Sequence, residues 1–258
     1  MPENVEYQCE VFYKDKKIAT TEYCELSMLS ESGGQQLVLL KLLKFNGLEQ
    51  QAVLEDAAFG DIVFSVDGIA IISEPVQFVG QTILPAFKDE LSLFIKMHLD
   101  NPAEFFISRQ LLRGWIKGID SMHWQDYPFA DFTNAWLVAC LIWQDLQKKK
   151  GALPLLPREL SVHIDCHCFQ DINGFLCHLG ELIFGAKGYV GRSIYSLDTE
   201  CMSDIVERGV RKINFVIQDE ALFQKKLIDY STEEQNYLLD WNHFVEAWKP
   251  YVSVNQEL

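Results

Sequence analysis

The sequence predicts two domains of different fold class: an N-terminal α+β domain with an antiparallel sheet, and a C-terminal α/β domain with a three-stranded parallel sheet. Through about residue 85, apolar and polar side chains alternate and turn dipeptides divide the chain, a pattern typical of antiparallel strands. Beyond residue 158, strand-like and helix-like segments alternate, which favours parallel pairing. The length of 258 residues also exceeds that of most single domains.

The N-terminal sheet is predicted from alternation and from turn chemistry. Tyr7, Cys9 and Val11 alternate with Gln8 and Glu10, as expected for a half-buried strand. The segments of this character are residues 5–13, 18–29, 36–45, 61–66 and 69–73. The dipeptides between them, Gly33-Gly34, Asn46-Gly47 and Asp67-Gly68, tolerate positive φ and therefore suit tight turns.

Helical spacing is predicted from Lys88 to about residue 148. Leu91, Phe94 and Ile95 have the spacing of one helix face, and the pattern continues through residues 106–119. Residues 128–148 predict a helix that is apolar nearly all round, so other elements must cover it. The following segment, 148–159, combines a charge run, Gly151 and two prolines, which indicates a domain boundary. We therefore place the domains at residues 1–150 and 158–258.

The C-terminal domain is predicted as strand, helix, helix, strand, helix, helix, strand. Residues 162–168 alternate as a strand, and residues 172–183 carry a helical stripe. A glycine loop follows, after which Ser193 can cap a helix through residue 205. The remaining elements are a strand at 213–217, a short helix at 222–227, a helix that starts at the capping box 231–234 and stops at Pro250, and a closing strand at 251–254.

The charge balance excludes one class of partner and favours another. The chain has 37 acidic and 22 basic residues, a formal net charge of −15. Such a charge repels phosphate backbones and attracts basic proteins, so we expect no nucleic-acid binding.

The cysteines and the apolar segments indicate a cytoplasmic protein. The seven cysteines are odd in number and mostly lie inside apolar patterns, which argues against a disulfide framework. No secretory signal is visible at the N-terminus. The uncharged stretch 132–143 is too short to cross a bilayer, so we expect no membrane association.

Enzymatic and metal sites receive little support. On a strand, His163, Asp165 and His167 share one face while Cys166 and Cys168 share the other, so the five side chains cannot converge on one ion. The glycine loop lacks the Gly-Lys-Ser/Thr ending of a phosphate-binding loop, and no nucleophile elbow is present. We therefore expect no catalytic residues, no metal and no cofactor.

An acidic helix after the glycine loop is the strongest candidate site. Asp198, Glu200, Asp204 and Glu207 lie on this helix, and a charge run of this kind is usually only a solvated face. Its context favours binding, because Tyr189 beside glycines predicts an exposed, rigid aromatic anchor, and the carboxylates can imitate phosphates for a basic pocket.

These residues resemble the recognition segment of the barstar family. Residues 188–193 are similar to its Gly-Tyr-x-Gly-x-Asn loop and 194–197 to its Leu-Asp-Ala-Leu, with Ser193 and Tyr195 in place of Asn and Asp. Glu200-Cys201 resembles its acidic residue before a cysteine, once one extra residue is allowed among 198–200. Residues 244–247 resemble its Phe-x-Glu-Ala, and the resemblance extends over 162–254 in the same order of elements.

The resemblance implies an immunity or antitoxin protein that occludes the basic active site of a nuclease toxin, most simply a ribonuclease. Either Asp198 or Glu200 would be the main inhibitory carboxylate. The implied partner-binding residues are Tyr189, Gly191, Ser193, Tyr195, Asp198, Thr199, Glu200, Asp204 and Glu246. The alternatives are a non-inhibitory binding or regulatory module on the same scaffold, and a metal-dependent enzyme. Residues 1–150 carry no recognisable role.

Overall fold

The chain divides into two compact units, Met1–Ile119 and Asp120–Leu258. The computed structural model describes residues 7–13, 16–21, 23–32, 35–43, 46–47, 52–54, 57–80, 82–84, 90–120 and 122–256. The boundary lies before the predicted one at 150–158, because helix α2 (Ala130–Lys149) packs on α3 (Ile172–Phe184) and so belongs to the second unit. An apolar helix must be covered by its neighbours, and α3 provides that cover.

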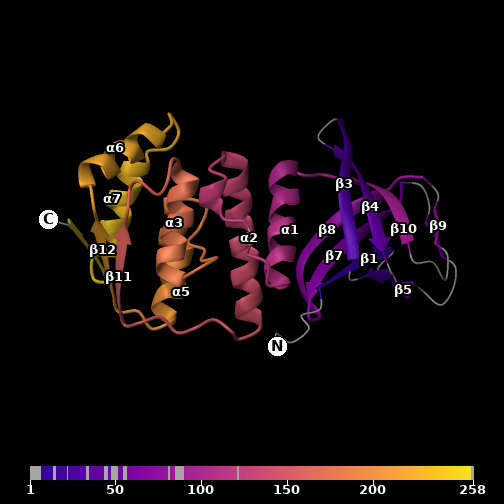
Figure 1. Ribbon diagram of the computed structural model, residues 1–258, viewed down its shortest axis with the longest axis horizontal. Coiled ribbons are helices and arrows are strands. Elements are labelled where there is room, and N and C mark those ends of the chain that lie inside the picture. The colour runs from indigo at the N-terminus through magenta and orange to yellow at the C-terminus, as the bar shows by residue number, and fades with distance from the viewer. Residues whose placement is uncertain are drawn as a thin grey trace. The chain divides into compact units, whose positions relative to one another are not determined.

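The first unit contains an antiparallel sheet with the strand order β3-β4-β10-β8-β7-β1-β2-β5, in which the two-residue β5 forms one edge (Figure 1). The strands are β1 (Tyr7–Tyr13), β2 (Lys16–Thr21), β3 (Tyr23–Ser32), β4 (Gln35–Leu43), β5 (Asn46–Gly47), β7 (Phe59–Val66), β8 (Ile69–Phe78) and β10 (Glu90–Met97). A separate antiparallel pair joins β6 (Ala52–Leu54) to β9 (Thr82–Leu84). The predicted α+β class of this domain is therefore confirmed.

Of the three predicted tight turns, one is confirmed and one is wrong. Asp67 and Gly68 have φ of 52° and 76° between the paired residues Val66 and Ile69, which is the two-residue hairpin that Asp-Gly favours. Asn46-Gly47 was wrongly predicted as a turn, because it pairs with β2 as strand β5. The predicted turn at Gly33-Gly34 lies outside the described residues. The single run predicted at 18–29 is two strands, β2 and β3.

The helix predicted from Lys88 is wrong, because residues 90–97 form strand β10 along β4 and β8. Leu93, Ile95 and Met97 are buried, whereas the side chains between them are exposed. This alternation of period two is the true signal, and the helical spacing of Leu91, Phe94 and Ile95 was coincidental.

Helix α1 (Pro102–Ile116) confirms the next predicted helix. Asn101 caps it by accepting a hydrogen bond from the amide of Glu104 at 3.2 Å. Arg109 of α1 forms an ion pair with Glu74 of β8 at 2.8 Å, and Arg113 donates to the carbonyl of Cys24 in β3 at 3.2 Å. These contacts hold α1 to the sheet within the first unit.

The second unit contains a three-stranded parallel sheet in the order β11-β12-β13, which confirms the predicted α/β class. Its strands are β11 (Glu159–Ile164), β12 (Lys212–Ile217) and β13 (Val252–Gln256). After α2 and α3, its helical segments are α4 (Ile194–Ser196), the π-helical turn η2 (Leu197–Cys201), α5 (Met202–Glu207), α6 (Glu220–Tyr230) and α7 (Tyr237–Ala247). The short 3-10 turn η1 (Trp124–Asp126) precedes α2.

The predicted capping box at 231–234 does not start α7. Ser231 instead follows the end of α6, where its hydroxyl donates to the carbonyl of Leu227 at 2.7 Å. Asn236 is the cap of α7 and accepts from the amide of Leu239 at 3.0 Å. The prediction overlooked Asn236, whose short polar side chain lies directly before α7 and satisfies one of its first amides.

An aromatic cluster forms the core beside the parallel sheet. The ring of Trp241 lies 5.3 Å from that of Phe223 and 5.4 Å from those of Phe215 and Phe244, measured between centroids. Phe175 of α3 lies 5.9 Å from the same indole. These edge-on and tilted contacts join α3, α6 and α7 to β12 through buried side chains.

Among the residues that the structure describes, no helix combines the length and the apolarity needed to cross a bilayer.

Candidate functional site

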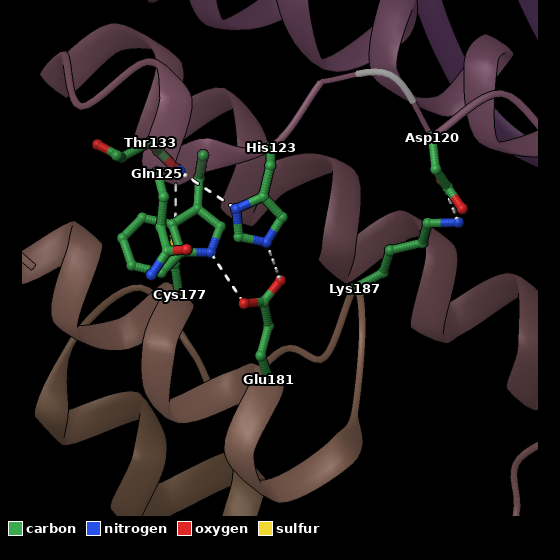
Figure 2. A network of polar contacts seen from close by, with 8 residues as sticks. Asp120, His123, Gln125, Thr133, Cys177, Glu181 and Lys187 are labelled. Atoms are coloured by element: carbon green, nitrogen blue, oxygen red, sulfur yellow. Dashed lines mark hydrogen bonds and ion pairs between the residues drawn. The ribbon is translucent and has the colours of Figure 1, made fainter. Parts of the chain in front are cut away.

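The turn η1 and helix α2 are fixed to α3 by polar contacts that the sequence did not predict (Figure 2). Glu181 of α3 accepts from the indole of Trp124 at 3.1 Å and lies 2.9 Å from Nε2 of His123. The Glu181 carboxylate raises the pKa of the His123 imidazole. Deeper between the helices, the thiol of Cys177 lies 3.8 Å from the carbonyl oxygen of Thr133. Together these contacts hold η1 and α2 against α3.

The glycines of the candidate loop are required by close backbone packing. A Cβ on Gly188 would lie 2.0 Å from the carbonyl oxygen of Gly180 in α3, and a Cβ on Gly180 would lie 2.3 Å from that of Gly188. Gly191 has φ of 122°, where a side chain would also meet Ser196 at 2.5 Å. The loop therefore lies directly against α3, in a conformation that glycine permits.

Tyr189 is half-buried, not exposed as predicted. Its backbone amide donates to the side chain of Gln144 in α2 at 3.2 Å. Burial, and secondarily the charge of Glu200, raise the pKa of the Tyr189 phenol to about 12. The prediction failed because α2 was assigned to the other domain, and α2 lies beside this loop.

Ser193 and Tyr195 occupy the start of the acidic segment. The hydroxyl of Ser193 accepts from the amide of Ser196 at 3.0 Å, which confirms its predicted role as a helix cap. Tyr195 is 68% exposed, the third largest exposure among the large hydrophobic residues of this unit that the structure describes, after Leu155 and Phe129. An exposed tyrosine of this kind offers a partner an aromatic contact and a hydroxyl group.

The segment 197–201 is a π-helical turn, in which the amide of Met202 donates to the carbonyl of Leu197. Such turns accommodate an additional residue inside a helix. The turn coincides with the one extra residue, among 198–200, that the barstar resemblance requires.

Asp198 and Glu200 differ sharply in their surroundings. An oxygen of Asp198 accepts from the indole of Trp248 at 2.5 Å, and Asp198 is only partly exposed. Glu200 and Thr199 are exposed, and within the described residues Glu200 has no hydrogen bond or ion pair. Of the two carboxylates, Glu200 is therefore the one available to a partner.

The two remaining predicted carboxylates have basic neighbours of their own. Asp204 lies 3.4 Å from the buried Arg208 and 3.6 Å from Lys148 of α2. Glu246 is exposed and lies 3.3 Å from the exposed Lys249, an arrangement that water screens and a partner can readily displace.

A cavity of about 180 Å³ brings some of the predicted residues together with α2. Tyr189, Gly191, Glu200 and Asp204 line it. Ser193, Tyr195, Asp198, Thr199 and Glu246 lie outside its lining. The contributions from α2, which include Leu141, Gln144 and Asp145, were missed because this helix was assigned to the other domain.

The metal-binding hypothesis is not supported by the geometry at the end of β11. The strand ends at Ile164, not Cys168 as predicted, because Asp165 turns the chain by accepting from the amide of His167 at 2.8 Å. This backbone bond lowers the pKa of the Asp165 carboxyl, and the thiol of Cys168 also donates to it at 3.3 Å. The part of the chain that is described contains no group of three or more histidine, cysteine or acidic side chains arranged to hold a metal ion.

Comparison of the chain with family models, with curated proteins and with solved structures finds no match.

Proposed function

We propose that the second unit is a barstar-like inhibitor domain, and that the protein is an immunity or antitoxin protein of the cytoplasm that neutralises a basic nuclease. The single observation that carries this proposal is the exposure of Glu200, whose carboxylate has no partner among the described residues. Glu200 lies on the helical segment that follows residues 188–191, the Gly-Tyr loop, which packs closely on α3. Exposed Tyr195 and Thr199 lie on the same segment. The parallel sheet and its order of helices are consistent with the resemblance.

Inhibition would act by occupation of the substrate site. Glu200 would sit where a nuclease binds a substrate phosphate and would form charge-assisted hydrogen bonds with its arginine or lysine residues. Tyr195 would fill an adjoining pocket as an aromatic anchor, and Glu246 would add a second carboxylate. Asp198 would hold the segment in place through Trp248 and would not contact the partner directly. The inhibitor itself would carry out no reaction.

The net charge of −15 supports a basic partner. Charge of this magnitude accelerates encounter with a positively charged protein, and salt screens the effect. The association rate should therefore fall as ionic strength rises.

A second candidate function is a binding or regulatory module whose partner is not a nuclease. The half-buried state of Tyr189 beside α2 favours this reading, because a residue expected to be a principal anchor is partly covered within its own unit. A stable partner without nuclease activity would select this alternative.

The test is inhibition by the full chain of a barnase-type ribonuclease and of any nuclease encoded beside its gene. RNA cleavage should be blocked at a 1:1 ratio, and calorimetry should show a tight complex. Glu200→Ala should weaken the complex by about 2 kcal/mol or more, roughly 30-fold. Glu234→Ala removes the same charge from another exposed position and should change affinity little. Equal effects of the two variants would refute the assigned site.

A further inference from the structure

The cavity between α2 and the Gly-Tyr loop is too small for a typical small-molecule ligand. Its volume is about 180 Å³, whereas pockets for drug-sized ligands hold about 300–1,000 Å³. A single protruding side chain is a better match for this size. The chemistry of the cavity walls determines which side chain fits best.

The walls combine one available carboxylate with apolar and aromatic surface. Glu200 lines the cavity and has no ion pair within the described residues. Leu141, 42% exposed, adds an aliphatic contact from α2, and the neutral phenol of Tyr189 adds an aromatic one. A side chain that carries a positive charge on an apolar stem satisfies both kinds of wall.

The charges around the cavity leave a net negative balance. Asp145, Glu200 and Asp204 line it, against Lys148 as the one basic residue in the lining. Asp204 already interacts with Lys148 and Arg208, and Asp145 lies 2.7 Å from Lys149, one turn further along α2. A cation that enters would therefore meet Glu200 first, with Asp145 nearby.

We propose that this cavity receives an arginine side chain of the protein partner, so that α2 is part of the binding surface. Arginine fits better than lysine because its planar guanidinium can bind a carboxylate through two hydrogen bonds and stack on an aromatic ring. The proposal rests on the proposed function for the identity of the partner. The arginine site adds a contact to the partner that the loop and the acidic segment alone would lack, because α2 supplies one wall of the cavity.

The first test needs no partner. The full chain is titrated with Nα-acetyl-arginine amide and, separately, with Nα-acetyl-lysine amide, which carries the same charge, while NMR follows the signals of Leu141 and Val190 methyl groups and the Tyr189 amide. The arginine probe should shift these signals with saturation and bind several-fold more tightly than the lysine probe. Glu200→Gln should weaken arginine binding about tenfold, and Glu234→Gln should not. Equal responses to the two probes, or no response to either, would overturn the proposal.

The second test uses the partner complex. Leu141→Arg places a guanidinium from α2 in the cavity and should weaken the complex at least about tenfold, whereas Leu239→Arg, at another exposed leucine of the same unit, should not. If Tyr195→Ala weakens the complex but Leu141→Arg does not, the inhibitor assignment stands and the arginine site is wrong. If the arginine probe binds but no nuclease is inhibited, the cavity assignment stands and the proposed function is wrong.

Discussion

The indole nitrogen of Trp248, just beyond α7, donates to a carboxylate oxygen of Asp198 in η2 at 2.5 Å. This bond joins two segments that are distant in the sequence and occupies one of the two carboxylates that could have faced a partner. Two acidic residues only two positions apart therefore differ in their surroundings: Asp198 is bonded to Trp248, whereas Glu200 is exposed and is the carboxylate proposed to contact the partner.

Asp198→Ala should destabilise the second unit by about 1–3 kcal/mol, because it leaves the indole N–H of Trp248 without its charged acceptor. Glu200→Ala should change stability by no more than about 0.5 kcal/mol, since Glu200 is exposed and without a partner among the described residues. Urea unfolding measures both. A double-mutant cycle of Asp198→Ala with Trp248→Phe should recover a coupling energy near the single-mutant loss, and additive effects would contradict the assigned bond.

The His123–Glu181 contact should make stability depend on pH in a defined direction. The hydrogen bond to Glu181 raises the folded-state pKa of His123 above its ordinary value of 6.5. The contribution of this contact to the free energy of unfolding is therefore fully present below pH 6.5, and it is lost as pH rises through the folded-state pKa of His123. Thermal unfolding between pH 5 and pH 9 should show this decline, and Glu181→Gln should flatten it. A decline of equal size in Glu181→Gln would show that another group is responsible.

His178 should act in the opposite direction. Burial lowers its folded-state pKa below 6.5, and its Nε2 atom has no hydrogen-bond partner among the described residues. The unfolded chain therefore binds a proton first as pH falls, so stability is lost from pH 6.5 down to the folded-state value. His178→Phe should remove this loss. Imidazole NMR signals, which report each histidine separately, should place the His178 midpoint below that of His123.

Gly188→Ala should cost about 3 kcal/mol, because the new methyl group would meet the backbone of α3. Gly151→Ala is a matched control: Gly151 has φ of 65° and open space around it, so the change should cost only about 1 kcal/mol. Urea unfolding gives both values. Gly188 itself has no positive φ, so a loss at position 188 no larger than that at 151 would contradict the assigned contact with α3.

Features that depend on a few neighbouring residues were predicted from the sequence more reliably than features that depend on periodicity. The Asp67-Gly68 hairpin and the Ser193 cap depend on chemistry within a few residues, and both were predicted correctly. The helix predicted for strand β10 failed because Leu91, Phe94 and Ile95 fit a period of 3.6, while the alternation that includes Leu93 fits a period of two. Short apolar segments often satisfy both patterns.

The candidate site was predictable in its acidic segment and loop, but not in its surroundings. Nothing local to Gln144 indicates that it holds the amide of Tyr189, 45 positions later in the chain. Likewise, nothing local to Asp198 indicates that its carboxylate accepts a hydrogen bond from the indole of Trp248. Both depend on tertiary packing, which brings together residues that no sequence window contains.

The π-helical turn has a consequence for how binding specificity can change. An extra residue in a regular helix would rotate everything after it by about 100° and expose the apolar face. Here Met202 and Ile205 remain fully buried after the turn, so the wide turn takes up the extra residue locally. The number of residues in this turn can therefore change without a change in the packing of the core. Gain or loss of one residue here would change the direction of Glu200, the carboxylate proposed to contact the partner, while the domain beneath it keeps the same fold.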